Sequence, residues 1–190
     1  DIPKSYGFKF VTDVVPKIGG KTADFDQLAK ASEGAEWFGV LRMDVDNLGE
    51  VFRQCETISR TATLSFLMNL FFEGWLVKIC QEYNKSDVGG DDNIYGVYSG
   101  GDDLFIVGAW NKLPLLAHQI REDFSKFVGG EHITISAGIA IEHPKFPLYI
   151  FSDNANIALD DMSKGVRREV NGKEKRKDAL CFLSKALSWD

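Results

Sequence analysis

Two short acidic segments contain the residue types best suited to chemistry in this chain. Residues 44–49, with the sequence DVDNLG, directly follow an apolar run at residues 37–43. Residues 99–105, with the sequence SGGDDLF, contain the adjacent carboxylates Asp102 and Asp103. Adjacent carboxylates repel each other, and a divalent cation bound beside them relieves the repulsion. We therefore predict a site that holds metal ions and nucleotide phosphates.

The second acidic segment has the pattern of a β-hairpin turn. Apolar runs rich in β-forming residues lie on both sides of it, at residues 94–98 and 104–109. Gly100 and Gly101 allow a bulky ligand to approach the backbone closely. The letters GGDD also occur at residues 89–92, but no apolar run precedes that copy. We interpret the earlier copy as a solvated loop.

Other elements are predicted from hydrophobic spacing and turn residues. After the strand at 37–43 and before the hairpin, residues 59–83 have the spacing of a long amphipathic helix. Beyond the hairpin we predict a helix at 112–128, a strand at 132–141, a helix at 148–164 and a strand at 179–183. The order βαββαβ indicates an α+β, ferredoxin-like domain with an additional C-terminal helix and strand. That arrangement places the first strand beside the central hairpin, and so Asp44 near Asp102 and Asp103.

The N-terminal residues do not belong to the predicted ferredoxin-like domain. Residues 1–34 are predicted to be a lead-in segment from a preceding domain, with a weak strand at 6–11 and a short helix at 25–31. Residues 19–22 (GGKT) resemble the end of a P-loop but lack its first glycine, so we interpret them as a turn. Because the chain starts with Asp1 and not Met, we expect an excised piece of a larger protein.

Composition excludes several classes of protein. A net charge of −6 argues against a self-sufficient nucleic-acid binder of the basic-stripe kind. Cys55, Cys80 and Cys181 form no CxxC pair and no zinc set, so they are interpreted as small buried residues of a reduced, intracellular protein. The uncharged stretch at 61–72 is too short to span a membrane, and no signal peptide is present. We expect a cytoplasmic protein with no membrane partner.

Three converging carboxylates suit Mg²⁺ or Mn²⁺. Two such ions, about 3.5–4 Å apart, clamp the attacking and leaving oxygens of a phosphoryl transfer. The predicted reaction is attack of a ribose 3′-hydroxyl on the α-phosphorus of a nucleoside triphosphate, with pyrophosphate leaving. Lys164 is a candidate for countering the triphosphate charge, or else a solvated residue that complements a helix dipole. Asp46 is interpreted as a helix cap, and capping is also the alternative for Asn47.

The two acidic segments together resemble the large subunit of CRISPR type III effector complexes, in its III-A form. The matching part is the second palm (GGDD) domain, which is related to GGDEF cyclases, and the similarity covers most of residues 24–184. Residues 35–190 would then be the palm domain. The resemblance implies synthesis of cyclic oligoadenylate from ATP, once a complex containing guide RNA and other subunits has bound target RNA.

The resemblance also implies roles for individual residues. Asp44, Asp102 and Asp103 would be catalytic and would bind the metal ions, with the Val45 carbonyl as a further ligand. Nucleotide binding is implied for eight residues: Asn47, Leu48, Gly49, Ser65, Ser99, Gly100, Gly101 and Lys164. The family's HD nuclease needs a His-Asp pair, and none of the three histidines precedes an Asp. Nuclease activity is therefore not expected of this piece.

Two alternatives stay open. One is a GTP-using GGDEF-type cyclase. The second acid of the turn argues against it, because this residue is Asp103 and not Glu. The other is a nucleotide-binding or assembly module without independent catalysis. The presence of all three acids argues against loss of the metal site. Because a cyclic product requires two nucleotide sites, we expect an isolated domain to bind ATP and turn it over poorly. The basic cluster at residues 164–177 has no assigned partner.

Overall fold

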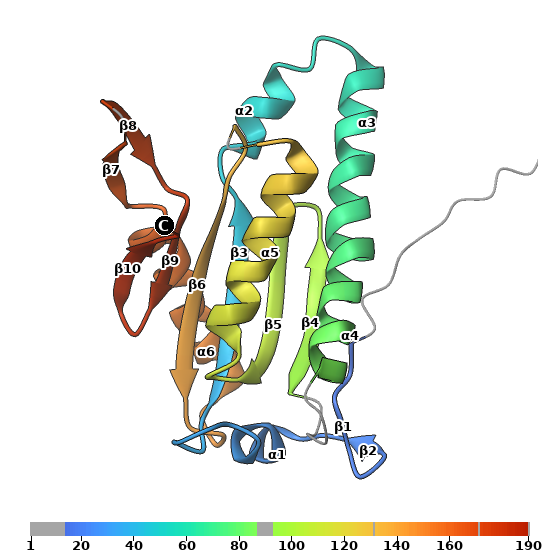
Figure 1. The fold of residues 1–190 in the computed structure, drawn as a ribbon, viewed down its shortest axis with the longest axis vertical. Helices are drawn as coiled ribbons and strands as arrows, with labels where there is room; N and C mark the ends of the chain where they lie inside the picture. The colour runs from blue at the N-terminus through green and yellow to red at the C-terminus, as the bar shows by residue number, and fades with distance from the viewer. Residues whose placement is uncertain (1–13, 87–92, 131, 171, 190) are drawn as a thin grey trace, which may run out of the picture.

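A six-stranded sheet forms the centre of the protein (Figure 1). The structure is a computed structural model and describes residues 14–86, 93–130, 132–170 and 172–189. The strand order is β10-β9-β6-β3-β5-β4. The bounds of these strands are β3 Phe38–Val45, β4 Ile94–Gly100, β5 Asp103–Ala109, β6 Ile135–Glu142, β9 Ala179–Phe182 and β10 Lys185–Ser188.

The pairing of the four inner strands confirms the predicted fold class. β3 runs antiparallel to both β5 and β6, and β4 runs antiparallel to β5. This is the ferredoxin-like arrangement, with the first strand between the third and the fourth. β9 then adds in parallel beside β6, and β10 pairs antiparallel with β9. β10 was not predicted, because its four residues are all exposed and show no apolar alternation.

Helices cover both faces of the sheet. In Figure 1, α5 (Leu113–Val128) and one continuous helix lie in front of the strands, and α6 (Leu148–Ile157) lies behind them. The continuous helix consists of α3 (Ile58–Asn69), a π-helical segment η1 (Leu70–Trp75) and α4 (Leu76–Ser86). α6 likewise continues as a π-helical segment η2 (Ala158–Ser163), and the short α1 (Phe25–Lys30) and α2 (Leu48–Arg53) complete the helices. The predicted helices are thus confirmed.

Each face of β3 packs against its own hydrophobic cluster. Met43 and Val45 face a core that includes Phe71, Phe72 and Phe124 from the front helices. The alternate residues Phe38 and Val40 face a smaller cluster that includes Phe151 of α6. Such alternation is the period of a strand that is buried on both sides. The same alternation places Arg42 and Asp44 on the α6 side of the sheet, beyond the end of the smaller cluster.

The continuous helix is longer than the uncharged stretch at 61–72. Ile58–Asn84 (27 residues) is long and apolar enough to cross a membrane, and 33% of its apolar window is buried. This is weak evidence for a membrane span, because core helices of soluble proteins meet the same criteria of length and composition. Phe71, Phe72 and Leu76 on this helix are buried in the core against the sheet.

Two small hairpins are separate from the six-stranded sheet. β1 (Lys17–Ile18) and β2 (Lys21–Thr22) pair across residues 19–20, which confirms the predicted turn there. β7 (Arg167–Val170) and β8 (Lys173–Arg176) form a second hairpin within the basic cluster. The predicted strand at 6–11 and the loop at 89–92 lie outside the described residues. The division at residue 34 stays a prediction.

Gly138 shows how closely η2 approaches the sheet. A Cβ atom at this position of β6 would overlap the Leu159 nitrogen and lie 2.6 Å from the Ala155 oxygen. Since both are backbone atoms, Gly138→Ala forces the helix away from the strand. We expect the free energy of unfolding to fall by about 1–3 kcal/mol, as for other overpacked sites.

Urea denaturation at neutral pH measures this effect. Gly49→Ala serves as the control, because a Cβ there meets nothing within 4 Å and the residue lies in a helix. Alanine is favoured over glycine in a helix by about 0.5–1 kcal/mol, so the control should be at least as stable as the original chain. Equal stabilities for the two variants would show that η2 does not depend on close contact at Gly138.

Candidate functional site

Asp44 and Asp103 lie opposite each other on neighbouring strands. The register of β3 and β5 pairs these two residues directly. Opposite residues of an antiparallel pair point to the same face, with Cα atoms about 4.5–5.5 Å apart. The two carboxylates therefore share one end of the sheet on the α6 side. The predicted meeting of the two acidic segments is confirmed.

A two-residue turn carries the third acid. Gly100 pairs with Asp103 across the hairpin, which leaves Gly101 and Asp102 as the turn. Gly101 has a φ of 70°, a conformation that glycine adopts without strain. The Asp102 carbonyl accepts a hydrogen bond of 3.2 Å from the Val45 N–H at the end of β3. The turn is thus fastened to the strand that carries Asp44.

Two basic side chains contact the paired acids. Lys164, which caps the end of η2, donates to Asp44 at 2.5 Å and to Asp160 at 2.9 Å. Arg42, two residues before Asp44 on the same face of β3, donates to Asp103 at 2.6 Å. Lys164, the candidate for countering triphosphate charge, therefore lies beside the acids, and its role toward a nucleotide stays a prediction, whereas Arg42 was not predicted. The sequence does mark Arg42, because it is the single cationic residue within the apolar run at residues 37–43.

The electrostatics of the site reflect both burial and these contacts. Burial raises the pKa of Asp44 above its ordinary value, although Lys164 opposes the shift. Burial likewise raises the pKa of Asp103 against the opposing effect of Arg42. For Lys164, burial disfavours the ammonium, but the hydrogen bonds that it donates to Asp44 and Asp160 outweigh this effect and hold the pKa above the ordinary value. The charged forms of the two acids are thus less favourable in the folded protein than in the unfolded chain.

The carboxylates of the site supply a free oxygen for a hard divalent cation, but too few of the described ones lie close together to hold one ion. Asp103 Oδ1 is buried and has no hydrogen-bond partner, so an oxygen is available to a ligand that the protein does not supply. Carboxylate oxygens are what Mg²⁺ and Mn²⁺ prefer. Within the described part of the chain, however, no three His, Cys, Asp or Glu side chains are close enough to hold one ion together. The metal-binding roles of Asp44, Val45, Asp102 and Asp103 stay predictions.

The interpretation of Asp46 as a helix cap is wrong. Its side chain is 3% exposed and accepts hydrogen bonds from Thr134 at 2.7 Å, Ser136 at 2.9 Å and the Asp178 N–H at 3.1 Å. Asn47 occupies the N-cap position of α2 instead, with a φ of 58° and no side-chain capping bond. Asp46 therefore joins the end of β3 to β6 and to the C-terminal extension.

The remaining predicted nucleotide-binding residues lie on three elements: α2, α3 and β4. Leu48 begins α2, and its side chain is buried in the core, so only its backbone is available to a ligand. Gly49 is exposed on the same helix, and Ser65 is exposed on α3. Ser99 and Gly100 are in β4, next to the turn. Their nucleotide-binding roles stay predictions.

A network of charged side chains around buried Asp178 was not predicted from the sequence. Asp178, which precedes β9, is buried and pairs with three cations: Arg121 at 3.3 Å, Arg168 at 3.0 Å and Lys175 at 2.8 Å. Through its N–H it also binds Asp46. No local pattern marks these residues, because the partners come from α5, β7 and β8.

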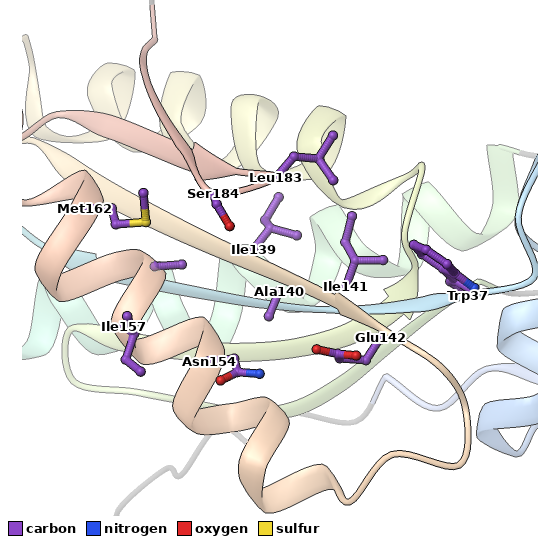
Figure 2. Close-up of a pocket in the computed structure, with 11 residues that line it drawn as sticks. Trp37, Ile139, Ala140, Ile141, Glu142, Asn154, Ile157, Met162, Leu183 and Ser184 are labelled. Atoms are coloured by element: carbon purple, nitrogen blue, oxygen red, sulfur yellow. The ribbon is translucent and has the colours of Figure 1, made fainter.

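A cavity of about 310 Å³ lies away from the acids, along the outer edge of β6 (Figure 2). Trp37, Ile139, Ile141, Ile157 and Leu183 contribute its apolar lining. Ile141 pairs with Gly39, near the start of β3, whereas Asp44 pairs with Ser136 near the start of β6. The cavity is thus toward the opposite end of the sheet from the acidic site, and its lining residues include none of the predicted site residues.

Comparison with known proteins agrees with the fold and the acidic motifs. Residues 37–181 match the family model described as Cas10/Cmr2, second palm domain. A curated relative from Methanocaldococcus jannaschii, the CRISPR system single-strand-specific deoxyribonuclease Cas10/Csm1 (subtype III-A), is 42% identical over 184 residues. That match covers 88% of this chain and 23% of the relative. The chain therefore spans about a quarter of the length of such relatives.

Solved structures show the same similarity. A Csm1-Csm4 cassette in complex with AMPPNP superposes with a TM-score of 0.77 and 32% identity, over 90% of this chain and 24% of that one. A Csm1-Csm4 cassette in complex with cA4 gives a TM-score of 0.76 and 32% identity, over 95% and 27%. The family match covers well over half of the sequence and includes both acidic segments. The chain belongs to the Cas10/Cmr2 second palm domain family.

Proposed function

We propose that this chain is a metal-dependent nucleotidyltransferase domain that joins ATP into cyclic oligoadenylate within a CRISPR type III effector complex. The observation that carries the proposal is the register of β3 and β5, which sets Asp44 directly opposite Asp103. Relatives with the same fold have been solved with AMPPNP and with cA4, which supports an adenine nucleotide as substrate. Csm4-like and other subunits, together with guide and target RNA, are the proposed partners.

Asp44, Asp102 and Asp103 would hold Mg²⁺ or Mn²⁺, with help from the Val45 carbonyl. Bound divalent ions would supply Lewis-acid stabilisation of the charge that develops on the oxygens of the reacting phosphate. The exposed Gly101 leaves room for a nucleotide beside the turn.

Lys164 and Arg42 would set the charge balance of the site. Lys164 is 21% exposed and contacts both Asp44 and Asp160, so it can exchange a carboxylate for a phosphate oxygen without leaving its position. Arg42 is bound to Asp103 Oδ2, which fixes the carboxylate and leaves Oδ1 directed elsewhere. The two cations therefore orient the acids before a nucleotide arrives.

Incubation of the assembled complex with ATP and Mn²⁺, in the presence of target RNA, tests the proposal. We expect pyrophosphate and cyclic oligoadenylate to form, and GTP to compete poorly. Equal use of GTP would instead support a GGDEF-type cyclase. Nucleotide binding with no pyrophosphate release would show that the domain is a binding or assembly module.

A further inference from the structure

The helix behind the sheet changes from α to π geometry just before it reaches the acidic site. Its last segment, η2, is followed by Lys164, whose N–H donates to the Leu159 carbonyl at 2.9 Å. That bond joins residues five positions apart, instead of the four of an α-helix, so the turn accommodates one additional residue. One residue corresponds to about 100° of rotation about a helix axis. The π turn therefore determines the side of the helix from which Lys164 projects.

Ser163, the last residue of η2, fastens this turn to the sheet. Its side chain is fully buried, and its hydroxyl lies 2.5 Å from the Ala137 carbonyl and 3.1 Å from the Ala158 carbonyl. A hydroxyl has one proton to donate, and the Ala137 carbonyl is the closer acceptor. Ala137 lies on β6 and pairs with Met43, the residue before Asp44. The hydroxyl thus joins the end of the helix to the strand beside the one that carries Asp44.

The contact at Gly138 and the hydrogen bond of Ser163 restrict the helix in different ways. A Cβ atom at Gly138 would lie 2.6 Å from the Ala155 oxygen and 2.8 Å from the Ala158 carbonyl carbon, so the glycine lets the two backbones pack directly. Backbone packing sets the distance between helix and strand, whereas a hydrogen bond also has a required direction. Loss of the hydroxyl therefore leaves the helix packed on β6 and removes a restraint on the geometry of its last turn.

The direction of Lys164 depends on that geometry. In the π turn its Nζ donates to Asp44 at 2.5 Å and to Asp160 at 2.9 Å. In a regular α turn the Lys164 N–H would instead bind the Asp160 carbonyl, four residues earlier. The side chain would then leave the helix about 100° further round the axis, which carries the ammonium away from Asp44.

We propose that Ser163 is a positioning residue, whose hydroxyl holds the π turn that sets the Lys164 ammonium against Asp44. The consequence for nucleotide binding rests on the proposed function, in which Lys164 is the cation that meets the triphosphate. The placement of Lys164 is a property of the chain alone, and it can be tested with no nucleotide present.

A crystal structure of the Ser163→Ala chain without nucleotide tests the placement. We expect the Lys164 N–H to bind the Asp160 carbonyl, and Lys164 Nζ to lie beyond hydrogen-bond distance of Asp44. Retention of both the Leu159 bond and the Asp44 contact would overturn the proposal. If Ser163→Ala does not fold, Ser163→Cys gives the same readout, because a thiol nearly preserves the volume and is only a weak donor.

Titration of the chain with AMPPNP in Mg²⁺ buffer tests the consequence. We expect Lys164→Met to weaken binding about tenfold, as for the loss of one charge-assisted bond, and Ser163→Ala to weaken it about three- to tenfold. Ser163→Ala should add no further loss to Lys164→Met, because it acts through the lysine. The matched control is Ser32→Ala, whose hydroxyl donates to the Trp37 carbonyl at 2.6 Å, near the other end of β3, and which should bind AMPPNP as the original chain does.

The double variant separates positioning from a general effect on the fold. An equal loss from Ser163→Ala with Lys164 present and with Lys164→Met would overturn the proposal, since the serine would then act independently of the lysine. If Lys164→Met leaves AMPPNP affinity unchanged, the role of Lys164 in the proposed function fails. The crystal structure of Ser163→Ala then still determines whether the hydroxyl places the lysine.

Discussion

Asp44→Asn is expected to abolish synthesis of cyclic oligoadenylate while the domain stays folded. Asp44 lies in the centre of the site, opposite Asp103 on one side and Ser136 on the other. The asparagine side chain lacks the negative charge with which a carboxylate binds a hard cation. Loss of such electrostatic stabilisation typically costs about 10³-fold in rate, equivalent to about 4 kcal/mol. Affinity for Mn²⁺, measured on the same variant, should fall at least about tenfold.

The stability of the fold should change little in Asp44→Asn, because the site is partly buried and disfavours the charge of Asp44. Burial raises the pKa of Asp44, so its charged form does not stabilise the fold, and loss of that charge is not expected to destabilise it. The amide oxygen can still accept from Lys164, which also keeps its bond to Asp160. We expect the free energy of unfolding to stay within about 1 kcal/mol, or about 2–4 °C in midpoint for a chain of this length.

A carboxylate on the other side of the sheet provides the control for this experiment. Asp123 on α5 binds the Trp75 indole and Lys126. Asp123→Asn removes one negative charge and keeps an acceptor for the indole, so synthesis should stay at the original rate. Activity within tenfold of the original in Asp44→Asn would show that the paired acids are not the catalytic site.

The sequence predicted the parts of the site that depend on regular patterns. Alternating apolar runs defined β3 and the hairpin, and the ferredoxin-like order then brought Asp44 beside Asp103. The glycine turn gave the position of Asp102. These inferences succeeded because strand pairing in a known order fixes neighbours that are distant in sequence.

The supporting contacts could not be predicted in the same way. Asp46 has the local context of a helix cap, yet its partners lie 88 to 132 positions further along the chain. Nothing near Asp178 indicates that it is buried among three cations. Strand β10 was missed because an exposed edge strand carries no apolar alternation. Hydrophobic periodicity specifies which elements pack together, but polar contacts between distant loops depend on the finished fold.

Asp178→Ala is expected to destabilise the fold more than Gly138→Ala or Asp44→Asn. Asp178 is fully buried, and Arg121, Arg168 and Lys175 are each largely covered, with side-chain exposures of 16%, 15% and 21%. Removing one partner of a buried ion pair leaves uncompensated charge and costs about 3–5 kcal/mol. Chemical denaturation should show this loss. Glu174→Ala, which removes an exposed carboxylate, serves as the control and should leave the unfolding midpoint almost unchanged.

The pH dependence of the loss identifies its origin. Burial alone would raise the pKa of Asp178, but hydrogen bonds from Lys175 and Arg121 outweigh it and hold the pKa below the ordinary value of 3.8. A carboxylate with a depressed pKa stabilises the fold above its unfolded pKa, and the stabilisation is lost as the pH falls through the folded pKa. The difference in unfolding free energy between the original chain and Asp178→Asn should therefore be complete at neutral pH. It should shrink once the pH is lowered past 3.8. A difference that is constant with pH would show that Asp178 stabilises the fold by packing and not by charge.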